Sequence, residues 1–328
     1  VYAGLPREVW MLSGALFINR FGTMVLPFLA LYLRNALGFR ESAVGWMLGL
    51  YGVGSVFGAY TGGRLIPVVG AIRLQIVALL LSVPLFLVIP LWDVTWAIGV
   101  SLFLLSFCSN AVRPANATAL THYAPVELRM RAFGLQRMAL NLGVSFGPVI
   151  GGVLSTIGFV WLFVVDAGTT FLCALSLIWF FGIRRQWRNE PVEAQRDASA
   201  SAVRSPLTDP MFVLFLTLLI LSALVFMQVH VTYPLFLSDQ YGLSKPAIGL
   251  IFAVNTVVIV VFEMLLLDVV RRWSMIRVIG CGGFLSCLGF GILPFGDSVA
   301  FCVLSMLIIT VGEMLWMPVA MGWAAQRS

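Results

Sequence analysis

Charged side chains are scarce in this chain of 328 residues, since only 10% are charged whereas 60% are hydrophobic. A soluble domain carries about 25% charged residues, so the composition excludes a soluble globule. Charge is missing altogether from windows such as Val44–Gly63 and Phe212–Val229. Because about 20 apolar residues in a helix cross the hydrocarbon core of a bilayer, the sequence predicts an all-α, polytopic membrane protein.

Lysine and histidine are almost absent as well. Lys245 is the only lysine, and His122 and His230 are the only histidines. None of the five cysteines has the spacing of metal ligands, and neither a nucleophile elbow nor a nucleotide-binding motif is present. These absences argue against a membrane enzyme and against ATP hydrolysis. No metal and no cofactor are expected.

Turn residues and charges divide the chain into ten predicted spans. They lie at 9–33, 41–66, 72–91, 95–122, 130–157, 159–183, 210–238, 245–269, 275–294 and 298–325. One connection is long, and it is rich in arginine, acidic residues, serine and proline. Such a segment cannot bury apolar area. We therefore expect an N-terminal half at 1–183, a linker at 184–209 and a C-terminal half at 210–328.

The distribution of arginine predicts the orientation in the membrane. With the N-terminus inside, fifteen of the 20 Lys and Arg residues fall in inner segments, and only Arg34, Arg40 and Lys245 fall in outer ones. Cytoplasmic loops carry an excess of Lys and Arg. The sequence therefore predicts a cytoplasmic N-terminus in the plasma (inner) membrane. Because topology accounts for the net charge of +6, nucleic acid is not an expected partner.

An internal repeat relates the two halves. When the chain is shifted by 204 residues, glycines, prolines and acidic residues superpose without a gap, because Gly38 meets Gly242, Pro90 meets Pro294, Asp93 meets Asp297 and Pro114 meets Pro318. Both copies start on the same side of the membrane and are therefore parallel. The first copy holds six spans and the second holds four. The expectation is an incomplete twelve-helix protein that lacks the counterparts of spans five and six.

The fifth predicted span carries a long glycine motif. It reads Gly134-x8-Gly143-x3-Gly147-Pro148-x2-Gly151-Gly152. The motif matches the fifth-helix signature of drug/proton antiporters, and two parallel six-helix halves resemble the major facilitator superfamily. The resemblance covers the whole chain and implies the fold of that superfamily. It also implies alternating access, with the glycine-rich helix sealing one gate.

Two further motifs bear on this resemblance. Arg113, within Asn110-Ala-Val-Arg-Pro-Ala-Asn116, resembles the arginine motif of the fourth helix. The loop after the second span keeps Gly63, Gly70 and Arg73 but lacks the usual Asp-Arg pair. In the second half, the residues expected to carry part of that loop's role are Asp268, Arg271, Arg272 and Arg277.

Intramembrane charges are the main candidates for function, because a charged side chain at mid-bilayer usually faces a cavity or a partner. Arg20 and Glu313 lie roughly 17 Å from the inner face, and Glu263 lies roughly 9 Å from it, at 1.5 Å per residue. In the fold of the resembled superfamily, spans one, four, seven and ten line the central cavity. The residues expected along the path of substrate and protons are Arg20, Arg113, Glu313, Asn19, Asn110, Asn116, His230 and Trp316.

The expected roles differ among these residues. Glu313 is the candidate for binding and releasing the coupling proton, and Arg113 for holding an anionic group or tuning a carboxylate. A structural ion pair is the alternative for Glu313. For Glu263 and Asp166, coupling and ion pairing both stay open.

Three functions are compatible with the sequence. The leading hypothesis is a monomeric, proton-coupled exporter of drug-like or sugar-like compounds. One alternative is a symporter that imports a peptide, a sugar or an organic anion. The other is a truncated remnant without transport activity.

Overall fold

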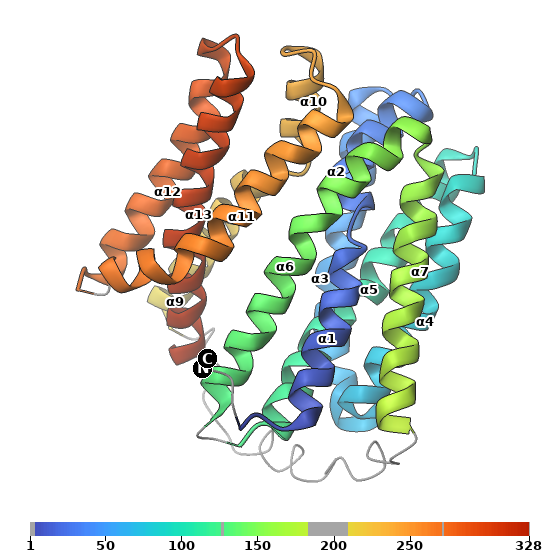
Figure 1. Ribbon diagram of the computed structural model, residues 1–328, viewed down its shortest axis with the longest axis vertical. Coiled ribbons are helices and arrows are strands. Elements are labelled where there is room, and N and C mark those ends of the chain that lie inside the picture. Colours follow the sequence, from blue (N-terminus) through green and yellow to red (C-terminus); the bar gives the residue numbers. More distant parts are fainter. Residues whose placement is uncertain (1–3, 126–127, 183–208, 271, 328) are drawn as a thin grey trace. The chain divides into compact units, whose positions relative to one another are not determined.

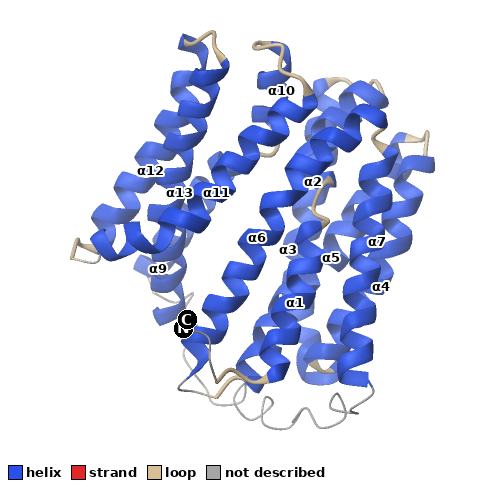
Figure 2. Cartoon of the chain, viewed as in Figure 1, coloured by secondary structure: helices blue, strands red, loops and turns tan. Residues whose placement is uncertain are grey.

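The computed structural model covers residues 1–328 and describes residues 4–125, 128–182, 209–270 and 272–327, except the side chains of Met130, Met264, Asp268 and 321–327. Those residues form helices joined by short connections, and none of them is in a strand (Figure 2). The linker predicted at 184–209 falls almost wholly outside the described residues, as does Arg271. The predicted all-α class is confirmed.

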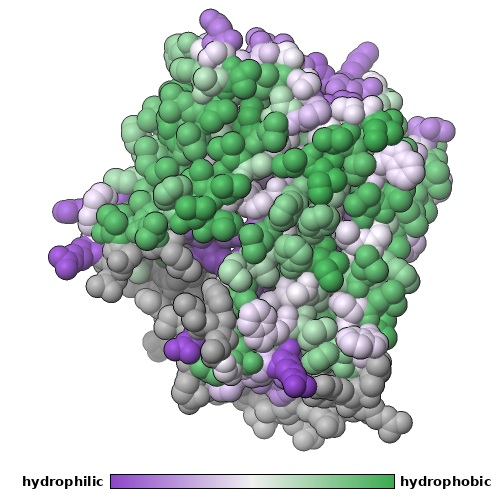
Figure 3. Space-filling model, in the orientation of Figure 1, coloured by the Kyte–Doolittle hydropathy of each residue, from purple (hydrophilic) through white to green (hydrophobic). Residues whose placement is uncertain are grey.

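Ten helical segments in the described part of the chain are long and apolar enough to cross a membrane. This confirms the predicted number of spans. Large apolar side chains are exposed on these segments, among them Val56, Leu214 and Ile276. Hydrophobic residues cover most of the visible helix surface in Figure 3, and hydrophilic residues gather near the helix ends. Exposed apolar area of this extent suits contact with lipid rather than water.

The chain divides into two compact units, Val1–Ser201 and Ala202–Ser328. Their helices follow one another as Figure 1 labels them. In unit 1 they are α1 (Arg7–Phe21), α2 (Val25–Leu31), α3 (Glu41–Val69), α4 (Ala71–Val88), α5 (Thr95–Tyr123), α6 (Arg129–Ile157) and α7 (Val160–Leu177). In unit 2 they are α9 (Pro210–Met227), α10 (Thr232–Asp239), α11 (Lys245–Val270), α12 (Met275–Ile292) and α13 (Val299–Arg327).

The repeat of the sequence is also a repeat of the structure. Helices α3, α4 and α5 begin 204 residues before α11, α12 and α13, respectively. The 3₁₀ turns η2 (Ile89–Leu91) and η7 (Leu293–Phe295) have the same offset. So do Gly38 and Gly242, whose φ angles are 69° and 61°. Glycine suits both turns, because a side chain disfavours the left-handed backbone region.

The spans predicted at 9–33 and 210–238 are present as Arg7–Ala36 and Pro210–Asp239, and in each of them the helix is broken. Helix α1 ends at Phe21 and α2 begins at Val25, after which a π-helical turn, η1 (Tyr32–Ala36), ends the span. In unit 2, α9 ends at Met227 and α10 begins at Thr232. Nothing in the sequence indicated these breaks, because the hydropathy of a broken apolar helix is the same as that of a straight one. The breaks free backbone groups that other helices can satisfy.

The first span of unit 1 is far better covered than that of unit 2. Helices α6 and α7 pack along α1, while α9 contacts α12 and α13. Accordingly, 61% of the most apolar window of Arg7–Ala36 is buried, against 17% for Pro210–Asp239. The described residues of unit 2 contain no counterpart of α6 and α7, and this explains the difference.

Candidate substrate and coupling sites

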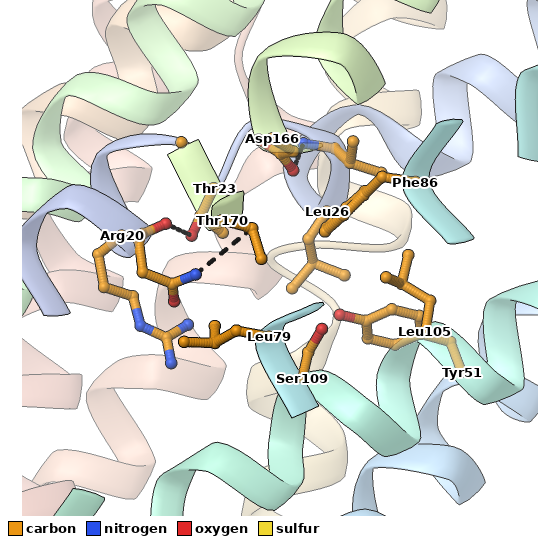
Figure 4. Close-up of a pocket in the computed structure, with 13 residues that line it drawn as sticks. Arg20, Thr23, Leu26, Tyr51, Leu79, Phe86, Leu105, Ser109, Asp166 and Thr170 are labelled. Atoms are coloured by element: carbon orange, nitrogen blue, oxygen red, sulfur yellow. Dashed lines mark hydrogen bonds between the residues drawn. The ribbon is translucent and has the colours of Figure 1, made fainter. Parts of the chain in front are cut away.

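A small polar cavity lies inside unit 1, where the break between α1 and α2 meets the neighbouring helices. Its volume is about 60 Å³. Polar side chains reach it from four helices, as Figure 4 shows. They are Asn19, Arg20, Tyr51, Ser109, Asp166 and Thr170, together with Thr23 from the break. The space suits water or one small polar group, because drug-sized ligands occupy roughly 300–1,000 Å³.

Arg20 lies on this cavity near the end of α1. Its Nε is buried and has no hydrogen-bond partner among the described residues. The neighbouring Asn19 donates a hydrogen bond from Nδ2 to Oγ1 of Thr170 on α7, at 3.5 Å. The hydroxyl of Thr23 donates to the carbonyl oxygen of Asn19 at 3.4 Å. The end of α1 is thus held in place, while the guanidinium of Arg20 keeps donors available.

Asp166 is buried on α7 and acts at the break of the first span. Its Oδ1 accepts a hydrogen bond from the backbone N–H of Met24 at 3.0 Å, and its Oδ2 accepts one from Val25 at 3.1 Å. A carboxylate there satisfies backbone donors that the start of a helix leaves unpaired. No ion pair of this carboxylate is found in the part of the chain that the structure describes.

The glycine stripe of α6 packs against the same broken span. A Cβ at Gly143 would lie 2.9 Å from the carbonyl oxygen of Phe17, and one at Gly147 would lie 2.5 Å from that of Thr23. At Gly151 it would lie 3.2 Å from the Cβ of Met24. Only glycine permits this approach of the two backbones. The remaining motif residues are half-buried Gly134 and buried Pro148 and Gly152 on the same helix.

Arg113 lies near the middle of α5, and its side chain is exposed. It is close enough to Arg20 for the two positive charges to repel each other, and Tyr51 on α3 is within electrostatic range of both. Tyr51 also forms a hydrogen bond with the side chain of Ser106. Arg20 and Tyr51 line the cavity described above, whereas Arg113 is not among the described residues that line it.

The two asparagines near Arg113 have packing contacts. Asn110 is buried and donates within α5 to the carbonyl oxygen of Ser106, at 2.9 Å. Asn116 donates to Oε1 of Gln75 on α4 at 3.2 Å and accepts from Nε2 of Gln136 on α6. Asn116 thus joins three helices, and the structure does not bring it to the cavity at Arg20.

Glu313 lies on α13 in unit 2 and is half-buried. Its Oε2 accepts a hydrogen bond of 3.1 Å from Nδ2 of Asn255 on α11. The same amide nitrogen donates to Oγ1 of Thr310 at 2.9 Å. An asparagine amide therefore orients the carboxylate and joins the two helices.

His230 and Trp316 belong to an aromatic cluster in unit 2. The ring of His230, in the break between α9 and α10, lies parallel to that of Phe252, with 6.0 Å between centroids. The buried Nδ1 of His230 has no hydrogen-bond partner in the described residues. Trp316 is buried and meets Phe226 edge to face at 6.1 Å.

The remaining predicted residues are spread over α3, α4, α11 and α12. Glu263 is buried on α11. Gly63 is exposed on α3, and Gly70, with a φ of 90°, separates α3 from α4. The exposed arginines near these helix ends are Arg73, Arg272 and Arg277. The side chain of Asp268 lies outside the described residues.

The sequence reasoning missed several residues of these sites, among them Tyr51, Thr170, Asn255 and Thr310. The amide of Asn255 within an apolar span was a signal that could have been used, because such groups seek partners in a membrane. Tyr51, Thr170 and Thr310 carried no comparable signal. No group of three or more potential metal ligands occurs in the described part of the chain.

Ten helices that are long and apolar enough to cross a membrane, with polar groups paired within each unit, define a polytopic membrane protein in the described part of the chain. The profile of the Major Facilitator Superfamily matches residues 12–328. The chain therefore belongs to this superfamily.

Several relatives are transporters. The chain is 27% identical over 323 residues to the uncharacterized MFS-type transporter YttB of Bacillus subtilis (strain 168), covering 96% of this chain and 79% of that one. It is 24% identical over 336 residues to a Na(+), Li(+), K(+)/H(+) antiporter of Planococcus maritimus, covering 93% and 78%.

A third relative matches a shorter stretch. The multidrug resistance protein MdtG of Citrobacter koseri (strain ATCC BAA-895 / CDC 4225-83 / SGSC4696) is 30% identical over 156 residues, 46% of this chain and 38% of that one. Among solved structures, a POT family transporter in complex with 5-aminolevulinic acid is similar, with a TM-score of 0.74 and 16% identity over 99% of this chain and 85% of that one. That likeness concerns the fold alone.

Proposed function

We propose that this protein exports small drug-like or sugar-like compounds by proton-coupled antiport. The observation that carries the proposal is the packing of the α6 glycine stripe on the broken first span. The stripe matches the antiporter signature, and Gly147 faces the backbone of the break itself. Straightening or bending the span at the break would change this contact, which suits a gate in alternating access.

Glu313 is proposed to bind the coupling proton. Intramembrane carboxylates form proton relays in transporters. The hydrogen bond from Asn255 holds the charged carboxylate at a defined place in unit 2. Release of that bond on protonation would connect proton binding to the position of α11 relative to α13. Two of the relatives, an antiporter and a multidrug resistance protein, support antiport and export.

We propose also that the protein is a monomer in the plasma membrane with its N-terminus in the cytoplasm. The three parts expected from the sequence, 1–183, 184–209 and 210–328, are retained in this proposal. Two alternatives compete with this proposal. One is import by symport, and the other is a truncated remnant without transport activity. Each predicts a different proton movement when substrate is added.

Proton movement in proteoliposomes tests the proposal. A pH-sensitive dye is enclosed, a proton gradient is imposed, and a panel of amphiphilic compounds is added. Antiport predicts that a substrate dissipates the gradient, and that Glu313→Gln abolishes this effect. Asp297→Asn is the control, because this exposed carboxylate lies in the connection between η7 and α13. Gradient formation by substrate would identify symport. No proton movement with any compound would exclude both.

A further inference from the structure

We infer that the connection between α11 and α12 binds the headgroup of an anionic phospholipid, with Arg272 and Arg277 on its phosphate. The inference goes beyond the proposed function, because a lipid held there is neither the transported compound nor the coupling proton. It gives a role to the arginines of this connection, which the transport proposal does not use.

A hollow opens beside this connection, within unit 2. Its volume is about 560 Å³. Hydrophilic side chains project next to a hydrophobic surface at the left edge of the view, where α11 meets α12 (Figures 1 and 3). Pockets of roughly 300–1,000 Å³ accommodate small organic ligands, so the space suits a headgroup. The residues that line the hollow are Arg272, Trp273, Ser274, Arg277, Gly280 and Cys281.

The polar side chains of the hollow donate hydrogen bonds that suit a phosphate. Two guanidinium groups carry permanent positive charge, and each presents its N–H donors in a plane. Such groups bind phosphate oxygens through paired, charge-assisted hydrogen bonds. The hydroxyl of Ser274 makes no capping hydrogen bond to α12, so it is a further donor beside them. No ion pair of Arg272 or Arg277 is found among the described residues, which favours an anionic ligand.

The place of the connection favours a lipid over a compound in solution. Helices α11 and α12 belong to segments long and apolar enough to cross a membrane, so the turn between them lies at a surface of the bilayer, at the depth of the lipid headgroups. Trp273 is 54% exposed, and exposed tryptophan is typical of this boundary. Basic pockets between membrane helices on the cytoplasmic side bind anionic headgroups. The proposed orientation places this connection on that side.

Space for an acyl chain continues along α12. A Cβ at Gly280 would have nothing within 4 Å, so no side chain closes the hollow there. Ile276 is 80% exposed, and it lies four residues before Gly280, on the same face of the helix. An acyl chain would lie against this face while its phosphate stays with the arginines.

The repeat of the two units shows that joining these helices does not require the polar groups. At the offset of 204 residues, Arg272 corresponds to Val68 in the connection between α3 and α4. In the same way, Ser274 corresponds to Gly70. Unit 1 thus connects the equivalent helices with neither this arginine nor this hydroxyl. The connection in unit 2 carries additional phosphate-binding groups that the turn itself does not explain.

The same repeat indicates that the hollow stays open in a unit with six spans. Unit 1 contains α6 and α7, for which the described residues of unit 2 have no counterpart. Val68 is nevertheless 68% exposed there, and Arg73, the counterpart of Arg277, is exposed as well. The face that carries Arg272 and Arg277 is therefore not one that helices of this kind cover.

Lipid binding to the full purified chain in detergent tests the inference. Native mass spectrometry counts bound lipids while dioleoyl phosphatidylglycerol or dioleoyl phosphatidylcholine is titrated in. The two lipids share their acyl chains and their phosphate, but choline adds a positive charge. We expect the first phosphatidylglycerol to bind at least about fivefold more tightly than the first phosphatidylcholine, the effect of about one arginine near an anionic surface. Equal affinities for the two lipids would overturn the inference.

Variants assign the preference to residues. Arg272→Gln and Arg277→Gln should each reduce it to about twofold or less, and Arg272→Lys should retain part of it, because lysine keeps the charge but not the planar donors. Arg73→Gln is the matched control, since it removes the corresponding exposed arginine of unit 1, and it should leave the preference unchanged. A full preference in folded glutamine variants, or an equal loss in the control, would overturn the assignment.

A variant that keeps both arginines guards against misfolding. Should a glutamine variant fail to fold, Gly280→Leu takes its place, because the new side chain fills the hollow. The affinity for phosphatidylglycerol should then fall several-fold, and an unchanged affinity would contradict the site.

A soluble phosphate distinguishes a lipid from a free anion. Glycerol 3-phosphate carries the charged part of the headgroup without acyl chains, so it should displace phosphatidylglycerol only weakly. Displacement at a concentration similar to that of the lipid would assign the site to a soluble phosphate compound and overturn the choice of a lipid. Since no transport is measured, a negative result here leaves antiport standing, and a failed proton assay leaves the lipid site standing.

Discussion

At the scale of single residues, two side chains form hydrogen bonds to polar groups inside the apolar helices. Asp166 accepts from two backbone N–H groups at the break of the first span. Asn255 donates to both Glu313 and Thr310. In an apolar surrounding each lost partner leaves a polar group without compensation. Substitution of Asp166 or Asn255 therefore tests the role assigned to that residue.

Replacing Asp166 should destabilise unit 1. Asp166→Ala leaves the N–H of Val25 without its side-chain acceptor, while the N–H of Met24 keeps only the carbonyl oxygen of Gly22, and one unsatisfied buried donor costs about 1–3 kcal/mol. Asp166→Asn keeps one acceptor oxygen and should cost less than alanine. The measurement is the midpoint of thermal unfolding in detergent. Asp297→Asn, at an exposed carboxylate, should change stability by no more than about 0.5 kcal/mol. An alanine variant as stable as wild type would refute the capping role.

Asn255 and Glu313 should act as a unit in transport. Asn255→Leu removes the donor to the carboxylate, so substrate-driven proton movement should fall towards that of Glu313→Gln. The double variant should lose less than the sum of the two single losses, because the residues share one interaction. Initial rates in proteoliposomes give the three comparisons. Thr256→Val is the neighbouring control, since the Thr256 hydroxyl donates within α11 to the carbonyl oxygen of Phe252 at 3.3 Å. Additive losses would show that the pair is not coupled.

At the scale of elements, α6 packs closely on the broken first span of unit 1. Gly143, Gly147 and Gly151 lie four residues apart and meet α1, the break and α2 in turn. Asp166 approaches the break from α7. Both α6 and α7 therefore stabilise the break in the first span, α6 by close backbone packing and α7 by hydrogen bonds.

A methyl group on the stripe should disturb this contact. In Gly147→Ala the new Cβ would lie 2.5 Å from the carbonyl oxygen of Thr23, so α6 must move away. Overpacking of this kind costs about 1–3 kcal/mol, and proton-coupled transport should be lost or strongly reduced. Gly14→Ala on α1 and Gly168→Ala on α7 are controls, since a Cβ at either has nothing within 4 Å. Equal effects of all three substitutions on transport and on thermal unfolding would contradict the gate assignment.

At the scale of the whole molecule, one helical unit is used twice with an offset of 204 residues. Equal offsets of helix starts, 3₁₀ turns and turn glycines show this in the described parts of both units. Units repeated in parallel place corresponding loops on the same side of the membrane. The orientation proposed from arginine placement then applies to both.

Accessibility of introduced cysteines tests this orientation. Ser244 and Ser274 are both exposed and lie just before α11 and α12. Ser244→Cys should react with a membrane-impermeant maleimide in intact cells, and Ser274→Cys only after permeabilisation. Mass spectrometry of the labelled peptides separates these sites from the natural cysteines. The reverse pattern would place the N-terminus outside.

The sequence alone determined the class, the number of spans and the repeat. These depend on hydropathy and on glycine and proline spacing, which act locally along the chain. The sequence did not predict the helix breaks within the first span of each unit, because the hydropathy of an apolar stretch is the same whether the helix is bent or straight. The tertiary structure decided that the first helix is interrupted at residues 22–24, because Asp166 on α7 accepts hydrogen bonds from the backbone N–H groups that follow the break.

The polar pairings likewise required the tertiary structure. Glu313, Arg20 and Arg113 were recognisable as charges in apolar spans, because an ion in hydrocarbon is costly wherever it lies. Their neighbours were not, because Asn255 lies 58 residues from Glu313 along the chain and meets it only when α11 packs on α13. Asn116 was expected on the substrate path, yet its hydrogen bonds join α4, α5 and α6. Spacing along one helix identifies a polar residue, but only the packing of several helices decides which groups it meets.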